Sequence, residues 1–119
     1  MSNNDIIPGF DFDTCDFLSI ELQKVEGMTN CLVLKPKGQI DTYSSHFLQK
    51  SAKKAINAGF INLIFLLDRV DYVSSKAIGA FVQTHRAATD VGGEIALVSV
   101  HPKVMEIFKN LGSTGIRVG

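Results

Sequence analysis

The chain has 119 residues, of which 45% are hydrophobic and 20% charged, a composition that indicates one globular domain with a core of its own. Twelve basic residues balance twelve acidic residues, and the zero net charge argues against nucleic acid or an anionic membrane surface as a partner. Two cysteines without a CxxC pair, no signal-peptide start and no apolar run near the roughly 20 residues of a membrane span predict a cytoplasmic protein with no direct membrane insertion.

Residues 1–16 are predicted to be an N-terminal leader, and residues 17–119 the domain itself. The leader mixes Ser, Asn, Pro, Gly and aspartates with Phe10 and Phe12, and Phe17 follows directly. A terminal segment of this kind is poorly ordered unless it is tied to the domain. The leader is therefore expected to be loose, or packed only through its phenylalanines.

The next two segments predict an N-terminal hairpin. Residues 17–25 partly alternate apolar and polar side chains, as a half-buried strand does. The turn sequence GMTN separates them from a second strand, residues 31–40. Pro36 has no N–H to donate to a neighbouring strand, so we expect an edge or a bulge late in this second strand.

The rest of the chain alternates amphipathic helices with buried strands. Apolar residues recur three or four positions apart in helices predicted near residues 45–58, 75–91 and 102–111. Residues 61–67 and 95–100 are apolar nearly throughout, as in parallel strands, and IRVG begins a last strand. Two strand–helix–strand crossovers then predict an α/β fold: a mixed sheet of four to five strands, with helices mainly covering one face.

Residue types that support catalysis or metal binding do not form a recognisable motif. His46, His85 and His101 lie far apart in the sequence, and His85 falls on the apolar stripe of its helix, which favours a core histidine. The sequence contains no HExxH, GxxxxGK[ST], GxGxxG or GxSxG. We therefore predict a protein that is not an enzyme and has no cofactor and no metal.

Two adjacent serines, Ser74 and Ser75, mark the predicted start of the second helix, after a loop that carries Asp68 and Asp71. A serine here can cap the helix, which is worth about 1 kcal/mol. A serine here can also be phosphorylated, because a helix start receives a phosphate well. Physical chemistry alone favours the cap, and one serine can cap while the other is modified.

Three stretches in register resemble a known family: GQIDTYSSHFLQ, LDRVDYVSSKAIGAFV and GGEIALVSVHPKVMEIFKNLG. They resemble the STAS domain and, within it, the bacterial anti-sigma factor antagonists, over roughly residues 17–118. The resemblance implies a small α/β domain that binds partner proteins.

In these antagonists, a serine at the start of the second helix is phosphorylated by a kinase that is also the anti-sigma factor. The matching residue is Ser75, so Ser74 is expected to be the structural serine that caps the helix or braces the loop. The family usually has Asp-Ser-Ser/Ala-Gly here, and this chain departs from it with Ser74, Lys76 and Ala77. The partner-binding residues implied by the resemblance are Asp41, Thr42, Ser44, Asp71, Ser74, Ser75 and Lys76.

The resemblance implies a protein-interaction switch. The unphosphorylated protein binds a serine-kinase-type anti-sigma factor or related regulator, and phosphorylation of Ser75 releases it. The alternative, favoured by the altered serine motif, is a non-phosphorylated STAS scaffold subunit of a signalling assembly, or of a membrane-lipid transport complex that binds an ATPase. An enzyme on the same frame is a third hypothesis, for which the sequence shows no cofactor cradle or catalytic triad.

Overall fold

The structure is a computed structural model that describes residues 2–109 and 115–119. Its helical segments are α1 (Asn3–Ile6), a 3₁₀ turn η1 (Phe10–Phe12), α2 (Thr42–Asn57), α3 (Lys76–Asp90) and α4 (Pro102–Phe108). Its strands are β1 (Leu18–Lys24), β2 (Cys31–Ile40), β3 (Asn62–Leu66), β4 (Val70–Val73), β5 (Glu94–Val98) and β6 (Arg117–Val118). The predicted end of the last helix, near residue 111, lies outside the described residues.

The strands form one mixed sheet in the order β1-β2-β3-β5-β6, with β4 paired to β2 beyond the end of β3. β1 and β2 are the predicted antiparallel hairpin, and the other pairs are parallel. Within the described residues the sheet has six strands, so the prediction of four to five was too low. The strand that was missed is β4, which had been interpreted as a loop. Four residues are too few to show a period, and two of them, Asp71 and Tyr72, are exposed.

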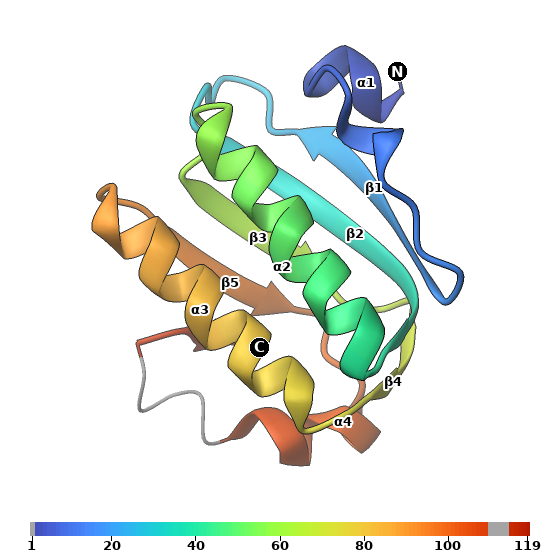
Figure 1. The fold of residues 1–119 in the computed structure, drawn as a ribbon. Helices are drawn as coiled ribbons and strands as arrows, with labels where there is room; N and C mark the ends of the chain where they lie inside the picture. The colour runs from blue at the N-terminus through green and yellow to red at the C-terminus, as the bar shows by residue number, and fades with distance from the viewer. Residues whose placement is uncertain (1, 110–114) are drawn as a thin grey trace.

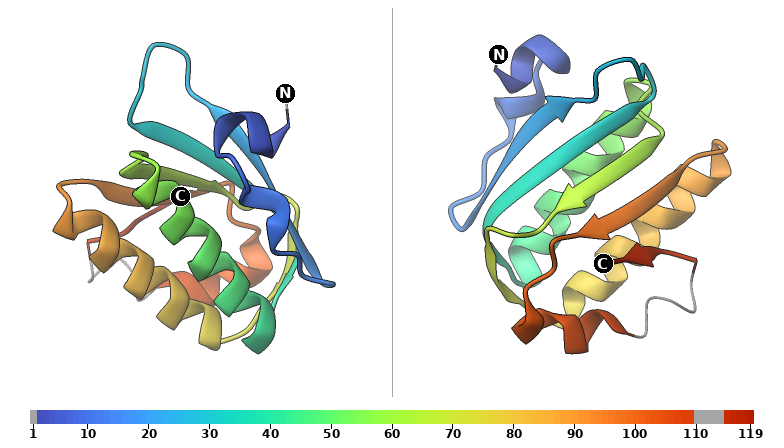
Figure 2. Two further views of the ribbon diagram at one scale, coloured as in Figure 1. Left: turned by 45° about the horizontal axis from the view of Figure 1, so that its top comes forward. Right: turned by 180° about the vertical axis from the view of Figure 1, so that it is seen from behind.

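α2 and α3 lie side by side across one face of the sheet, and the view from behind shows the opposite face without a helix (Figures 1 and 2). This confirms the predicted one-sided cover. Phe81 on α3 is fully buried and makes edge-to-face contacts with Phe65 on β3 and Phe108 on α4, at ring-centroid distances of 5.3 and 5.5 Å. Burying each such ring contributes roughly 1.5–3 kcal/mol. The three rings therefore hold α3 and α4 to the sheet.

The leader is more ordered than the sequence predicted. Ile7 and Phe10 are buried, whereas Phe12 is 90% and Phe17 60% exposed, so the leader does not pack only through its phenylalanines. The side chain of Asn3 donates to the carbonyl of Ile20 at 2.6 Å and accepts from the N–H of Leu22 at 2.8 Å. These bonds tie the leader to the outer edge of β1, where unpaired backbone groups would otherwise face solvent.

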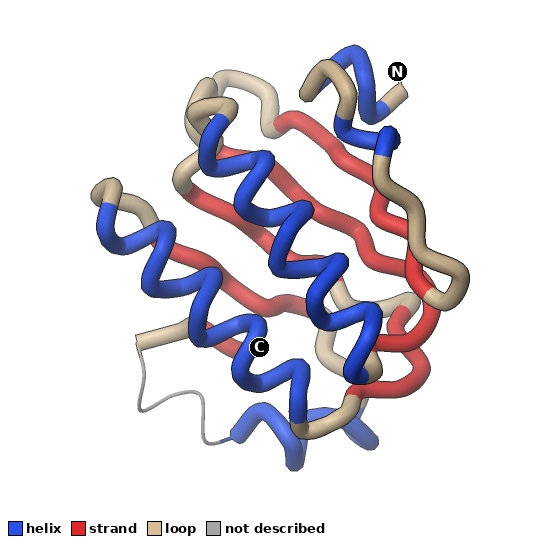
Figure 3. The backbone as a smooth tube through the Cα atoms, viewed as in Figure 1, coloured by secondary structure: helices blue, strands red, loops and turns tan. Residues whose placement is uncertain are grey.

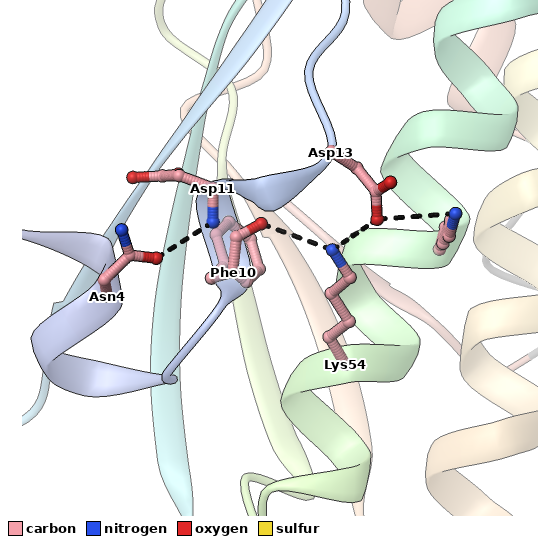
Figure 4. A network of polar contacts seen from close by, with 6 residues as sticks. Asn4, Phe10, Asp11, Asp13 and Lys54 are labelled. Carbon is pink, nitrogen blue, oxygen red and sulfur yellow. Dashed lines mark hydrogen bonds and ion pairs between the residues drawn. The ribbon is translucent and has the colours of Figure 1, made fainter.

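A second set of contacts joins the leader to α2 (Figure 4). The Lys54 ammonium lies 2.7 Å from the Asp13 carboxylate and donates to the carbonyl of Phe10 at 3.3 Å, and Lys50 lies 3.3 Å from the same carboxylate. Hydrogen bonds from Lys54 and then Lys50 hold the pKa of Asp13 below its ordinary value. Two of the lysines of α2, Lys50 and Lys54, therefore form ion pairs within the molecule.

Pro36 lies where β2 changes partner on one side. β3 pairs with β2 as far as Leu34, and β4 pairs with it from Gly38 onward, with a register shift after Gly38. The Gly38 N–H donates to the carbonyl of Arg69, so by strand alternation the nitrogen of Pro36 faces the gap between β3 and β4. The missing N–H therefore costs no ladder bond, and the bulge predicted from Pro36 lies two residues further on.

Figure 3 shows the helices as separate segments, with strands and loops between the longer ones. Among the described residues, none of these helices has both the length and the apolar composition needed to cross a membrane.

Candidate functional site

The two loops that carry the predicted site residues lie at the same end of the sheet. Ile40, the last residue of β2, pairs with Val73, the last residue of β4, and the N–H of Ser74 donates to the carbonyl of Ile40 at 2.9 Å. α2 and α3 follow these strands directly and begin side by side (Figure 1). The short strand β4, absent from the sequence-based prediction, is therefore the element that brings the two helix starts together.

The start of α2 is closed by a capping box. The Asp41 carboxylate accepts hydrogen bonds from the N–H groups of Tyr43 and Ser44, at 3.0 and 2.9 Å. The Ser44 hydroxyl in turn accepts from the N–H of Asp41 at 2.8 Å and lies 2.6 Å from the Gln39 carbonyl, to which it donates. The Ser44 hydroxyl also lies 3.0 Å from the Asp41 carboxylate, so its proton is shared between this carboxylate and the Gln39 carbonyl. Hydrogen bonds from Ser44 and then from the Tyr43 N–H lower the pKa of Asp41. This helix start is a closed set of bonds.

The prediction that Ser44 contacts a partner is wrong. Its side chain is fully buried under the turn that it closes, so it has no surface to offer. Asp41 keeps part of its surface, but its carboxylate holds the helix start in place. Two of the predicted binding residues thus have a structural role at this end.

The start of α3, unlike that of α2, has no side-chain hydrogen bond to its first turn. Ser75 occupies the N-cap position, but its side chain makes no capping hydrogen bond and is exposed to solvent. The Ser74 hydroxyl is buried and has no hydrogen-bond partner. The prediction that Ser74 caps the helix is therefore wrong. Ser74 stands one residue before the N-cap, with its backbone N–H held by β2, so its hydroxyl does not reach the first-turn N–H groups.

The remaining predicted residues, Thr42, Asp71 and Lys76, are all exposed around the two helix starts. Between the helices, Thr42 and His46 of α2 face Lys76 and Gly79 of α3 across a shallow hollow. The structure therefore brings five of the seven predicted binding residues to one surface, if Asp41 and Ser75 are counted with these three.

Sequence reasoning missed three exposed aromatic residues beside this surface. Tyr43 on the first turn of α2 is 81% exposed, Tyr72 on β4 is 51% exposed, and Phe17 is the exposed residue at the entry to β1. Phe17 and Tyr72 lie on either side of Gln39, because the Gln39 N–H donates to the Phe17 carbonyl and Gln39 pairs with Tyr72. Exposed aromatic residues are enriched in protein interfaces. Of the three, only Tyr72 stands next to the serine motif in the sequence, and its position there was the signal available.

Within residues 2–109 and 115–119, no three His, Cys, Asp or Glu side chains come close enough together to hold a metal ion. At this end of the sheet the structure brings together two helix starts, the exposed residues Thr42, Ser75 and Lys76, and an aromatic rim formed by Phe17, Tyr43 and Tyr72.

Comparison with known proteins gives a consistent result. A family model described as "STAS domain" matches residues 19–116. "Putative anti-sigma factor antagonist BtrV" of Bordetella bronchiseptica is 23% identical over 99 residues, which cover 83% of this chain and 83% of that protein.

Solved structures have the same fold. A "putative anti-sigma factor antagonist" from Thermotoga maritima superposes with a TM-score of 0.72 at 20% identity, covering 83% of this chain and 84% of that one. The anti-sigma factor antagonist SpoIIAA of Bacillus, in its unphosphorylated form, gives 0.70 at 18% identity, covering 85% and 88%. Its phosphorylated form gives 0.65 at 16% identity, covering 85% and 91%. The predicted STAS fold is therefore confirmed.

Proposed function

Because this chain belongs to the STAS domain family, we propose that it is a non-catalytic protein-interaction switch of the anti-sigma factor antagonist type. In its unphosphorylated form it binds a serine-kinase-type anti-sigma factor or a related regulator in the cytoplasm and thereby frees a transcription factor. Phosphorylation of Ser75 releases the partner. The observation that carries the proposal is the hydroxyl of Ser75 at the start of α3, which is exposed and makes no capping hydrogen bond.

Ser75 is accessible to a kinase without any rearrangement of the fold. Its hydroxyl makes no capping bond that phosphorylation would break. A phosphate adds about −1.5 to −2 charge units, and the positive end of the α3 dipole favours that charge at this position. Phosphorylation therefore leaves the domain folded and changes only the surface that the partner meets.

The surroundings of Ser75 explain why a phosphate releases a partner. The residue lies at the start of α3, directly before exposed Lys76, which faces exposed Thr42 across the hollow, and Tyr43 and Tyr72 are exposed at the same end of the sheet. A bound protein must exclude water from the centre of such a surface. A dianion placed there would have to be desolvated or paired, and interfacial charge penalties of several kcal/mol are enough to reverse binding.

Incubation with the partner kinase and ATP, followed by intact-mass measurement, tests the proposal. The wild-type protein is expected to gain one phosphate, Ser75→Ala none, and the neighbouring control Ser74→Ala one. Ser75→Asp is expected to fold normally and lose partner affinity, whereas Ser75→Ala keeps it. A phosphate that survives Ser75→Ala would show that another residue is modified.

One observation favours the scaffold function as a second candidate. Lys76 is an exposed cation directly after Ser75, at a position where the related motif has a small residue, and Ser74 replaces an acidic residue. A partner ATPase or signalling subunit that binds the helix starts equally well in the presence and absence of kinase and ATP would support this candidate. Absence of phosphate on every serine would then exclude the switch.

A further inference from the structure

We propose that the groove between α2 and α3 binds an acidic helical segment of the partner protein. This inference rests on the proposed function in one respect, namely that a protein partner docks at the start of the two helices. It adds the chemistry of the segment that is bound, and it predicts which lysines bind it.

The groove is formed by two adjoining hollows. The first lies at the helix starts and includes His46 and Lys76, and the second lies further along and includes Lys53. Gln49 and Gln83 line both hollows, so the two form one continuous groove. No aspartate or glutamate lines either hollow. The groove therefore offers positive and neutral groups only.

The two helices carry an excess of positive charge in a neutral protein. α2 contains three lysines and no acidic residue, and α3 contains Lys76 and Arg86 against Asp90 alone. Five basic residues against one acidic residue leave four net positive charges within the two helices, and the N-cap Asp41 and the leader residue Asp13 reduce this excess to two, whereas the whole chain has twelve of each. Charge of one sign on one face attracts a partner of the opposite sign.

The lysines in the groove are the ones that remain available. Asp13 of the leader forms ion pairs with Lys50 and Lys54, and neither of these lysines lines the groove. Lys53 and Lys76 are exposed, and neither takes part in an ion pair among the residues that the structure describes. Asp13 thus offsets one of the two positive charges on one side of α2 and leaves Lys53, on the side that faces α3, unpaired among the described residues.

The length of the groove suits a helix better than a single small anion. Lys53 stands seven residues after His46 on α2, which is about 10 Å along the helix axis. A partner helix with carboxylates two turns apart would reach both the His46–Lys76 end and Lys53. Gly79 and Ala80 line the first hollow and leave room for such a helix, because neither has a long side chain.

The same arrangement gives the phosphate a second effect. Ser75 directly precedes Lys76, the cation at the entrance of the groove. A phosphate of about −1.5 to −2 charge units outweighs one lysine and makes that end of the groove negative. It would then repel the carboxylates of the acidic segment, in agreement with release on phosphorylation.

The test uses a synthetic helical peptide of about 20 alternating Ala, Leu and Glu residues, long enough to form a helix, and a matched peptide with Lys in place of Glu. Both are titrated into the unphosphorylated full chain while amide NMR shifts and fluorescence anisotropy are recorded. We expect the Glu peptide to bind and to shift the amides of Gly79, Gln49 and Gln83. Lys53→Glu with Lys76→Glu should weaken binding about tenfold or more, and the neutral Lys53→Gln with Lys76→Gln less.

Lys37→Glu is the control, because Lys37 is an exposed lysine on β2, outside the groove. Equal weakening by Lys37→Glu, equal binding of the Lys peptide, or absence of Glu-peptide binding would each overturn the inference. So would a single-stranded oligonucleotide of equal charge that shifts the same amides when the Glu peptide does not. None of these measurements involves phosphorylation, so the switch at Ser75 and the acidic segment can fail independently.

Discussion

The starts of α2 and α3 lie side by side and both contain serines, yet they are built in opposite ways. At α2, the Asp41 carboxylate and the Ser44 hydroxyl satisfy backbone groups of the first turn and are satisfied in return. At α3, neither Ser74 nor Ser75 makes a side-chain hydrogen bond to the helix. Neighbouring helix starts with similar residues can therefore serve stability in one case and leave a hydroxyl free for chemistry in the other.

Backbone bonds explain how α3 begins without a cap. The N–H of Ala77 donates to the carbonyl of Ser74 at 3.1 Å, and the N–H of Ile78 donates to the carbonyl of Ser75 at 3.2 Å. These three-residue spacings are those of a 3₁₀ turn, which satisfies some of the N–H groups that a helix start leaves unpaired. The hydroxyl of Ser75 is thus not needed for folding.

The largest effect in this comparison is expected for Ser44→Ala. The change removes the fully buried Ser44 hydroxyl and leaves the Asp41 N–H and the Gln39 carbonyl, both only partly buried, without their partner, so the free energy of unfolding should fall by about 1–2 kcal/mol. Urea denaturation followed by circular dichroism measures it. Thr42→Ala, two residues away and exposed, is the control and should stay within about 0.5 kcal/mol of wild type. Equal effects of the two variants would contradict the closed set of bonds at α2.

Ser74→Ala is expected to have the opposite sign. Its hydroxyl is buried without a hydrogen-bond partner, and an unsatisfied buried polar group is itself destabilising. Removing it should raise the free energy of unfolding by up to about 1 kcal/mol. A loss of the same size in thermal and urea denaturation would instead show that this hydroxyl caps α3 in solution.

The sequence predicted the order of strands and helices better than the side-chain hydrogen bonds at the helix starts. The pattern of apolar residues predicted β3, β5 and the main helices, because the side chains that an element buries are apolar and their spacing can be seen in the sequence. The resemblance implied that Ser44 binds a partner, but its side chain is buried, and of the two roles predicted for Ser74, a helix cap or a loop brace, the structure contradicts the cap. Which hydroxyl reaches a first-turn N–H depends on the pairing of β2 with β4, and β4 is too short to show a period.

The position of Ser75 came from the family resemblance, and the structure adds its exposure and its lack of a capping bond. The basic groove between α2 and α3 could not be predicted from the sequence of either helix alone, because residues of both helices line it. It depends on which lysines of α2 the leader occupies, and Asp13 is 41 positions away from Lys54 in the sequence.

A third prediction concerns pH. The hydrogen bonds of the capping box hold the pKa of Asp41 below its ordinary value of 3.8, so folding favours the carboxylate. The resulting stability is present above pH 3.8 and is lost as the pH falls through the lower folded pKa. Asp41→Asn keeps a capping oxygen but does not titrate, so the stability of this variant should fall less steeply below pH 3.8.

Asp13, whose pKa is also lowered, titrates in the same range. The melting temperatures should therefore be compared in an Asp13→Asn background, between pH 2 and pH 6 as an approximate range. Identical pH profiles with and without Asp41→Asn would show that the cap at α2 contributes nothing through its charge.

The smallest effect on stability is expected for Ser75→Ala. The side chain is exposed and makes no capping bond, so the free energy of unfolding should change by less than about 0.5 kcal/mol. At an N-cap whose side chain does make the capping hydrogen bond, the same substitution lowers the free energy of unfolding by about 1 kcal/mol. Side-by-side urea denaturation of Ser44→Ala and Ser75→Ala measures the difference directly. If Ser75→Ala proves as costly as Ser44→Ala, the hydroxyl holds the helix in solution, and a kinase would have to disrupt the start of α3 to reach it. If its cost is near zero, the hydroxyl is free to receive a phosphate while the fold stays intact.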